Sequence, residues 1–411
     1  MTLYPLESLL ASGVMMFLCQ LGARRQIGIK LRTESTAKSF AALFNIEQFP
    51  HGDTLADLCE ELEVKQVSRV SQRIIKKLVR KKVLSEHRLF NQYYMIAVDG
   101  TGTFRFKNRH CDYCLTRPHA SGEIDYYHNV LEAKLITESG FAFSVMSEFI
   151  ENGPTESPSK QDCELRAFYR LAKRLKKGFK RLPICLHMDA LFANGVVFDL
   201  CRKNAWPFII TLQDGSLRTI NGEYERLKDL QPANALSRRT GKKKEILQNY
   251  AWVNDIAFTD SKQNIHYINV FECKEVKPGK NAEIIKTKFK YVTNFNVENT
   301  NVVTLSNGGR ARWKIENEGF NVQKNGGYGL KHAYSEDPTG FKVFYLLMQI
   351  AHTIAQLVAH GNLLKKIFPK GFGSAANLAF ALLEAMRNCS ITPMQIALIN
   401  STKIQIRFDS S

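Results

Sequence analysis

Three acidic residues, each in a different local context, are the side chains of this sequence best suited to carry chemistry. Asp99 lies in MIAVDGTG and Asp189 in ICLHMDALFANG, and each ends an apolar run that predicts a buried strand. Glu316 lies in RARWKIENEGFN, a polar stretch that predicts a helix. Three carboxylates that a fold brings together can hold two divalent metal ions against a phosphodiester. The residue types therefore predict a nuclease-like site, and the alternative for each Asp is an ordinary helix N-cap.

The elements that must position these carboxylates follow a definite order. From about residue 92, three segments alternate apolar and polar residues as an antiparallel meander does, namely MIAVDGTGTFRF, YYHNVLEAKLIT and GFAFSVMSEFI. A basic helix near 160–177, the strand that ends at Asp189, a helix near 194–204 and the strand PFIITLQ follow. Asp189 and Glu316 are 127 positions apart, which is too many for a loop. The segments NYAWVNDIAF, NIHYINVFECKE and FKYVTNFNV predict strands in that interval.

These segments together resemble the DDE transposases of bacterial insertion sequences. The similarity spans roughly residues 40 to 360 and is carried by IAVDGTG, YYHNVLEAKL, LPICLHMDALFANG, FKYVTNFNV and, most specifically, RWKIENEGFNVQKNGGYGLKH. The resemblance implies an α/β (α+β) fold, with an RNase H-like mixed sheet flanked by helices and a β-rich insertion. It implies that Asp99, Asp189 and Glu316 are the catalytic residues and hold two Mg²⁺ ions, which Mn²⁺ can replace. The expected activity is cleavage at terminal inverted repeats followed by strand transfer.

Helical geometry gives an interpretation of the segment around the third carboxylate. At about 100° per residue, Arg312 and Glu316 lie one turn apart on one face of a helix, and Gln323 falls near the same direction. A cation beside a metal-binding carboxylate suits a site that must grip phosphates as well as ions. Glu318 is the rival ligand, but it lies about 120° from Arg312 on an ideal helix. We therefore prefer Glu316.

Part of the family pattern around Glu316 is missing. The pattern has Tyr, two residues, Arg, three residues, Glu, six residues and Lys, and Arg312 and Glu316 fit it. Gly309 stands at the Tyr position and Gln323 at the Lys position, with Lys324 one residue later. Two alternatives therefore stay open: a catalytically inactive DNA-binding relative, and a metal-dependent nuclease without strand transfer.

An excess of basic residues indicates a polyanionic partner. The 411 residues include 57 Lys and Arg against 39 Asp and Glu, a formal net charge of +18, and double-stranded DNA is the expected partner. A long helix near 64–84 is basic on one side and apolar on the other, although a solvated helix face would look the same. A basic patch at 238–244 is either a DNA contact or a solvated loop. The residues predicted to contact DNA are Arg312, Trp313, Lys324, Lys331 and His332 near Glu316, and Arg73, Lys76 and Lys77 on the basic helix.

A second group of candidate ligands lies in NRHCDYCLTRPHASGEIDYYHNV. Cys111 and Cys114 form a CxxC pair, which binds zinc when another pair of ligands converges on it. His110, His119 and His128 are the nearby candidates. Without a second CxxC, the pattern leaves open both a structural zinc at Cys111 and Cys114 and reduced thiols packed in a loop.

The chain is long enough for more than one domain. The N-terminal part predicts helices near 5–22 and 35–44 and a third helix with Asp53 as its N-cap. The expected domains are a helical N-terminal domain that binds DNA ends (1–90), the first part of the catalytic domain (91–214), a β-rich insertion (215–300), and the catalytic Glu helix with C-terminal helices (301–411).

No targeting or membrane segment is expected. The apolar stretch Leu3 to Leu21 lacks a basic leader, and polar residues interrupt the run from Val343 to Leu364, so both predict core helices. Nine cysteines, an odd number, favour a reducing compartment, and we expect a cytoplasmic protein. The sequence has no GxxxxGK[ST] or GxSxG motif, so ATP hydrolysis and serine-hydrolase chemistry have no local support. Because two DNA ends must be brought together, a homodimer on DNA is expected.

Overall fold

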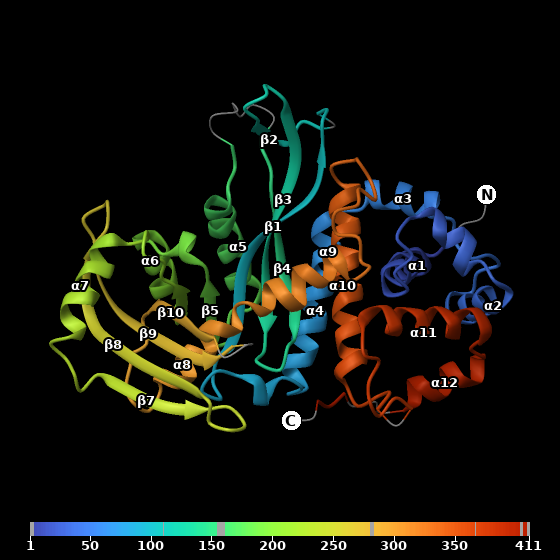
Figure 1. Cartoon of the computed structure of the whole chain (residues 1–411). Helices are drawn as coiled ribbons and strands as arrows, with labels where there is room; N and C mark the ends of the chain where they lie inside the picture. The colour runs from blue at the N-terminus through green and yellow to red at the C-terminus, as the bar shows by residue number, and fades with distance from the viewer. Residues whose placement is uncertain are drawn as a thin grey trace.

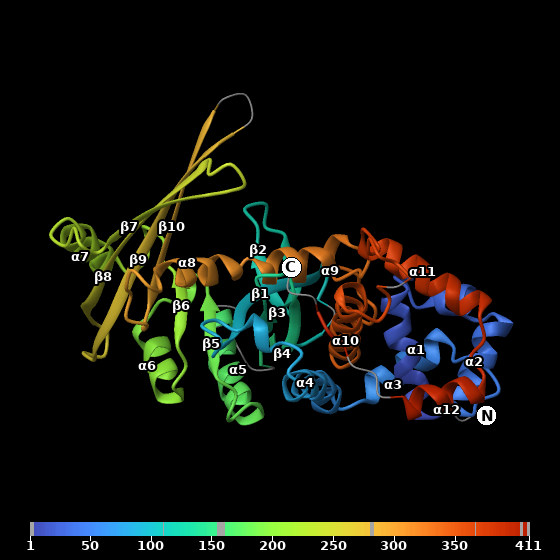
Figure 2. The same ribbon diagram turned by 90° about the horizontal axis from the view of Figure 1, so that it is seen from below.

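The computed structural model describes residues 4–109, 111–153, 161–279, 283–365, 367–402 and 406–408. Within these ranges, a mixed sheet of ten strands is flanked by helices on both faces (Figures 1 and 2). The predicted α/β (α+β) class is therefore confirmed. The sheet positions all three predicted carboxylates: Asp99 lies on a strand, Asp189 directly follows a strand, and Glu316 lies on a helix packed against the sheet.

The strand order of the sheet is β2-β3-β1-β5-β6-β10-β9-β8-β7, and β4 also pairs with β3. Strands β1, β3 and β4 form an antiparallel meander, whereas β5 and β6 run parallel to β1. β10 pairs antiparallel with β6, so the strands of the predicted insertion extend the central sheet. The strands are β1 (Tyr94–Phe106), β2 (Leu115–Pro118), β3 (Ile124–Ile136), β4 (Ala142–Ile150), β5 (Ile184–Met188), β6 (Phe208–Thr211), β7 (Ala235–Thr240), β8 (Ile246–Thr259), β9 (Ile265–Pro278) and β10 (Ile284–Thr293).

Most helices begin and end close to the residues that the apolar patterns predict. The α-helices are α1 (Leu6–Leu18), α2 (Glu34–Phe44), α3 (Gly52–Glu61), α4 (Val64–Arg80), α5 (Glu164–Gly178), α6 (Gly195–Asn204), α7 (Arg218–Lys228), α8 (Val302–Ala311), α9 (Val322–Asn325), α10 (Gly340–His360), α11 (Ala375–Asn388) and α12 (Pro393–Ser401). Two segments are π-helical, η1 (Ile27–Leu31) and η6 (Ile315–Asn321), and two are short 3₁₀ turns, η2 (Ser85–His87) and η4 (Ala190–Phe192). The N-cap prediction for α3 is wrong: His51 is the N-cap and accepts a hydrogen bond from the Asp53 amide, which places Asp53 in the first turn.

Alternate residues of β1 face two different hydrophobic cores. Ile96 and Val98 belong to the core that α4, α5 and α6 cover, whereas Met95 and Ala97 belong to the core beneath α8 and η6. Figure 2 shows α4, α5 and α6 on one side of the sheet and α8 on the other. Because side chains alternate along a strand, Asp99 faces the same side as Ala97, toward α8 and η6.

The N-terminal and C-terminal helices lie side by side. One hydrophobic cluster runs from Met16 in α1 to Leu383 in α11, with α10 in between, and Figure 1 shows the blue and red helices together beside the sheet. Among the described helices, α10 is long and apolar enough to cross a membrane, but 83% of its apolar window is buried inside the protein. The helix therefore belongs to the core, as its interrupted apolar run predicts.

Candidate metal and nucleic-acid site

Two of the predicted carboxylates lie beside each other on parallel strands. The register of β1 and β5 pairs Tyr94 with Ile184 and Ala97 with His187, and its continuation sets Asp99 beside Asp189. The expectation that Asp99 ends its strand is wrong, because β1 continues to Phe106, paired with β3. The strand that ends here is β5, and the Asp189 carboxylate accepts a hydrogen bond from the Leu191 amide at 3.0 Å, as an N-cap does.

The third carboxylate, Glu316, lies on a π-helix rather than an α-helix. η6 packs against β1 and β4, and Gly319 allows a close approach, because a Cβ there would lie 3.2 Å from the Lys134 side chain. The expectation that Glu316 and Gln323 share one face is wrong: Glu316 is exposed and Gln323 is fully buried. A π-helix has more residues per turn than the 3.6 that the prediction assumed, so the directions of successive side chains shift.

Arg312 is the immediate partner of Asp99. Its Nη1 donates to the Asp99 carboxylate at 3.0 Å, in a pair whose side chains are 14% and 20% exposed. Burial first, and then the charges of Asp189 and Glu316, raise the pKa of Asp99 to about 6 against the opposing charge of Arg312. The three carboxylates therefore act on one another electrostatically. They are not among the described groups of side chains whose ligand atoms all lie within 4.8 Å of one another, so binding one shared ion would require side chains to move.

A fourth carboxylate, Glu164, lies at the same place and was missed by the sequence analysis. It begins α5, and its carboxylate occupies the space beside Gly100, where a Cβ would lie 2.1 Å from its Oε1. Burial raises the pKa of Glu164 to about 7, and the charges of Asp99 and Asp189 contribute. The only sequence signal was a Glu in the first turn of a helix, where an acidic residue is common because of the helix dipole.

The two departures from the family pattern have structural causes. A Cβ on Gly309 would lie 2.6 Å from the ring of Tyr291, so that ring fills the space beside position 309. Gln323 donates to Gln349 and bonds His352 in a buried polar network. Tyr291 therefore fills the space beside Gly309, and the Gln323 side chain is buried.

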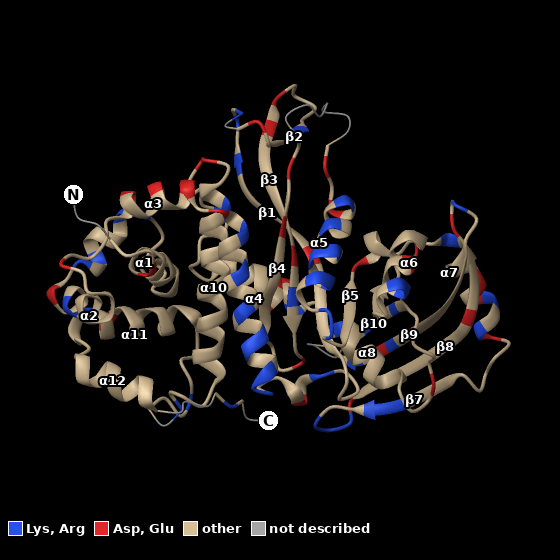
Figure 3. Ribbon diagram, turned by 180° about the vertical axis from the view of Figure 1, so that it is seen from behind, with Lys and Arg blue, Asp and Glu red and all other residues tan. Residues whose placement is uncertain are grey.

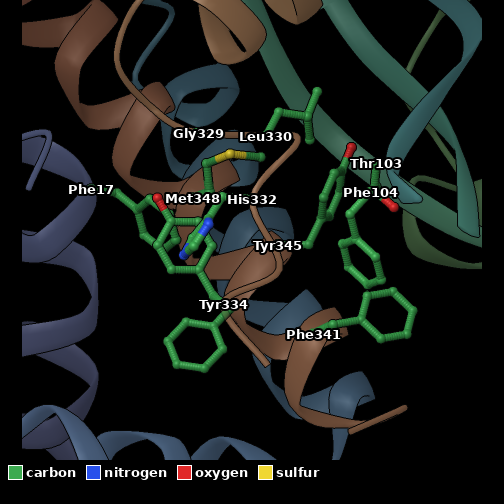
Figure 4. Close-up of a pocket in the computed structure, with 11 residues that line it drawn as sticks. Phe17, Thr103, Phe104, Gly329, Leu330, His332, Tyr334, Phe341, Tyr345 and Met348 are labelled. Carbon is green, nitrogen blue, oxygen red and sulfur yellow. The ribbon is translucent and has the colours of Figure 1, made fainter. Parts of the chain in front are cut away.

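The predicted DNA contacts near Glu316 differ in their surroundings. Trp313 is 54% exposed, and Lys331 is exposed on the loop between α9 and α10. The Lys324 ammonium lies 5.6 Å from the centre of the Phe320 ring. His332 packs edge-on against Tyr334 at 4.7 Å, beside an aromatic-lined pocket shown in Figure 4. Trp313, Lys331 and His332 are therefore exposed, whereas Lys324 is half-buried.

A basic groove lies between α4 and α5. It has a volume of about 610 Å³ and no acidic side chain in its described lining, and Figure 3 shows the blue Lys and Arg residues gathered on the two helices. The cations that line it are Lys65, Arg69, Arg73, Lys76, Arg174 and Lys177. Arg73 and Lys76 were predicted as DNA contacts, whereas Lys77, predicted with them, is exposed outside this lining. The groove is on the α4 and α5 side of the sheet, opposite α8, so it is separate from the carboxylate face.

The basic patch at 238–244 lies on an edge strand and the hairpin that follows. Arg238 and Arg239 belong to β7, and Lys242, Lys243 and Lys244 lie exposed in the turn before β8. Arg238 donates to Gln248 at 2.9 Å. The patch is therefore part of the antiparallel extension of the sheet.

Two further groups of side chains have the spacing of metal ligands among the described residues. Cys111, Cys114 and His128 form one, and Asp199, Asp260 and His266 form the other. In the second group, Asp260 already accepts hydrogen bonds from the amides of Lys262 and Asn264 in the turn between β8 and β9.

Of the other histidines considered for zinc, His119 pairs with Asp125 at 3.0 Å, and His110 lies outside the described residues. All nine cysteines lie within the described ranges, and none of them forms a disulfide.

Comparison of the sequence with protein-family models gives no match, and none of the curated proteins searched matches it.

Proposed function

We propose that this protein is a DNA transposase of the insertion-sequence type, which binds terminal inverted repeats, cleaves the strand and joins the freed 3′ end to target DNA. The observation that carries the proposal is the neighbouring position of Asp99 and Asp189 on parallel strands, with Glu316 close enough to raise the pKa of Asp99. The segments that resemble DDE transposases contain these same three residues. A cytoplasmic location follows from this function.

The strand order supports an RNase H-like interpretation. A meander of β4, β3 and β1 is followed along the chain by α5, β5, α6 and β6, and the two later strands join parallel to β1. Strands β7 to β10 come before the helix of the third carboxylate, where the resemblance implies an insertion. The carboxyl end of a parallel strand is a frequent position for binding groups, and Asp189 lies at such an end.

Asp99, Asp189 and Glu316 are the residues that would hold two Mg²⁺ ions, with Mn²⁺ as a replacement. Carboxylate oxygens suit these cations. Burial first, and then neighbouring carboxylate charges, raise the pKa values of Asp99 and Glu164, and a bound cation would favour the ionised form of both groups. Bound there, the ions would activate water and stabilise the departing 3′ oxygen. Arg312 would leave Asp99 and bind a phosphate oxygen of the DNA, because a guanidinium binds both carboxylates and phosphates. Glu164 would add negative charge to this site and pack against β1 at Gly100.

The two predicted DNA surfaces lie on opposite faces of the sheet, so they would contact different DNA segments. The face with Trp313 and Arg312 would hold the cleaved end, and the groove with Arg73 and Lys76 would hold a second duplex segment by its phosphates. Two ends must be joined in one reaction, which favours a homodimer on DNA.

We also propose a structural Zn²⁺ at Cys111 and Cys114.

The decisive experiment uses DNA that carries the inverted repeats flanking the coding sequence, incubated with the full chain and Mg²⁺. Joined products on a gel are the expected result. Cuts without joining would indicate a plain metal-dependent nuclease, and shifted but uncut DNA would indicate an inactive DNA-binding relative. Either result would overturn the transposase proposal.

The groove is tested separately by DNA binding at several salt concentrations. Removing one cation that neutralises a phosphate reduces the slope of log affinity against log salt by about 0.9. The double variant Arg73→Ala/Lys76→Ala should flatten the slope by about 2 for this reason. Lys77→Ala, on the same helix but outside the lining, is the matched control and should change the slope less than either single groove variant. Equal slopes in all variants would exclude the groove as a DNA contact.

A further inference from the structure

Cys111, Cys114 and His128 have the mutual distances of ligands on one tetrahedral ion. The two Sγ atoms are 3.5 Å apart, and the His128 Nε2 lies 3.3 Å from the Cys111 Sγ and 3.8 Å from the Cys114 Sγ. Zn–S bonds of about 2.3 Å and Zn–N bonds of about 2.0 Å place such ligands about 3.5 to 3.8 Å apart. A disulfide would need about 2.05 Å between the sulfur atoms, so the two cysteines are reduced, as metal-binding cysteines must be.

The three ligands come from a loop and from a buried position on a strand. Cys111 and Cys114 lie between β1 and β2, whereas His128 lies on β3 and is fully buried. The His128 ring packs 4.6 Å from the ring of Phe341 and 5.8 Å from that of Phe104, and Figure 4 shows these two phenylalanines next to each other. This packing fixes the ring position, so the ligand set is largely formed before any ion binds.

The same loop is bonded to the segments that lead into α5. The Asn152 side chain donates to the Cys114 carbonyl at 2.9 Å, and the Asn152 amide donates to the Tyr113 carbonyl at 3.2 Å. The Gln161 side chain bonds both the amide and the carbonyl of Thr116, at 2.6 and 2.9 Å. Glu164 begins α5 three residues after Gln161. An ion that holds the loop would thus also hold the start of α5.

We propose that Cys111, Cys114 and His128 bind one structural Zn²⁺, which fixes the loop between β1 and β2 and, through Asn152 and Gln161, the position of Glu164 beside Gly100. Two cysteines and one histidine are soft and borderline ligands that prefer zinc to Mg²⁺. Binding displaces the thiol protons, so two thiolates balance the charge of the ion. A tetrahedral zinc takes one further ligand, which water, histidine or cysteine can supply.

Metal analysis of the full chain, purified without chelator, tests the assignment. We expect about one zinc per chain in the wild type and in the control variants His119→Ala and Cys163→Ser, and less than about a tenth in Cys111→Ser, Cys114→Ser and His128→Ala. Cys163 is an exposed cysteine and His119 pairs with Asp125, so these controls change the same residue types outside the site. Less than about a tenth of an equivalent in the wild type would overturn the proposal.

Cobalt substitution covers the case in which a ligand variant fails to fold. The wild-type chain, stripped of metal and loaded with Co²⁺, should show tetrahedral absorption bands and a thiolate charge-transfer band. Octahedral cobalt without the charge-transfer band would contradict the site. Neither measurement depends on DNA cleavage, so its failure is distinguishable from failure of the proposed transposase activity.

Discussion

The carboxylate site and the cysteine–histidine cluster gather metal-binding side chains in opposite ways. Cys111, Cys114 and His128 come from neighbouring parts of one hairpin and already lie within ligand distance of one another. Asp99, Asp189 and Glu316 come from β1, the end of β5 and a helix on the far side of an insertion. The charges of Asp189 and Glu316 act against the ionised form of Asp99, and Arg312 pairs with Asp99.

This difference reflects the work expected of each site. Neutral thiols and an imidazole pack together without an ion at little electrostatic cost, so a structural site can be preformed. Carboxylates that stay ionised repel one another unless a cation lies between them. A site held partly open by an arginine can take up ions together with phosphate. The comparison therefore predicts a rigid, tightly loaded cluster and a weakly loaded, exchangeable carboxylate site.

The largest effect should come from removing one carboxylate at a time. Asp99→Asn, Asp189→Asn or Glu316→Gln should lower DNA cleavage by about a thousandfold or more, because each would remove one of the proposed ligands of the ions that activate water. DNA binding, measured by gel shift, should stay near the wild-type value. Glu318→Gln is the matched control, since Glu318 pairs with Lys314 at 3.2 Å and should lose only a small part of the activity. Cleavage that survives all three changes would refute the assignment.

Removing each metal in turn should show which of the two sites stabilises the folded protein. Stripping zinc with a strong chelator should lower the melting temperature of the wild-type chain by about 5 °C, because ion binding contributes to folding. Brief treatment with a weak chelator should remove Mg²⁺ only, with a change of about 1 °C or less. The converse order, with the larger loss on removing Mg²⁺, would mean that the carboxylate site is the structural one.

Arg312→Ala should make the chain more dependent on Mg²⁺. The variant leaves Asp99 largely buried without a cationic partner, so the metal-free protein should melt a few degrees lower, by about 2–4 °C. Mg²⁺ would replace the missing charge, so its addition should raise the melting temperature of Arg312→Ala more than that of the wild type. An equal rise in both proteins would show that Arg312 does not occupy the cation position.

The parts of the site that sequence could predict are those set by local patterns. Apolar runs located β1 and β5, since a buried strand is a local feature, but the Asp that ends the run marks the end of the strand only in β5. Glu164 and His128 carry no such pattern, because a Glu in a first helical turn and a His in a strand are ordinary. Their surroundings arise from packing against residues far away in the chain, which periodicity does not record.

The segment around Glu316 shows a second limit of sequence reasoning. A 3.6-residue period placed Gln323 with Arg312, but the hydrogen bonds of η6 shift to the π pattern and Gln323 turns into the core. Likewise, the sequence marks Gly309 only as a missing Tyr. The ring of Tyr291, on a strand of the insertion, is what leaves no room there for a side chain. Both facts depend on tertiary contacts that form after the local elements.

The smallest predicted effect concerns Glu164, whose ionisation is disfavoured first by burial and then by the charges of Asp99 and Asp189. The pKa of Glu164 is raised to about 7 from an ordinary 4.5, so ionising it costs free energy in the folded protein. That cost is fully present above pH 7 and disappears below the ordinary value. Glu164→Gln should therefore raise the melting temperature of the metal-free protein by about 1–2 °C at pH 8 and leave it unchanged near pH 4.5.

The sign of the Glu164 effect should reverse when Mg²⁺ is present. The wild-type carboxylate then attracts the ions instead of repelling its neighbours, so Mg²⁺ should stabilise the wild type more than Glu164→Gln. Glu61→Gln, at an exposed position at the end of α3, is the matched control and should show no pH-dependent difference. A gain at pH 8 that persists at pH 4.5 would mean that Glu164→Gln acts through packing beside Gly100. The carboxylate site would then differ from the cysteine–histidine cluster in its position in the fold, but its charges would not destabilise the folded protein.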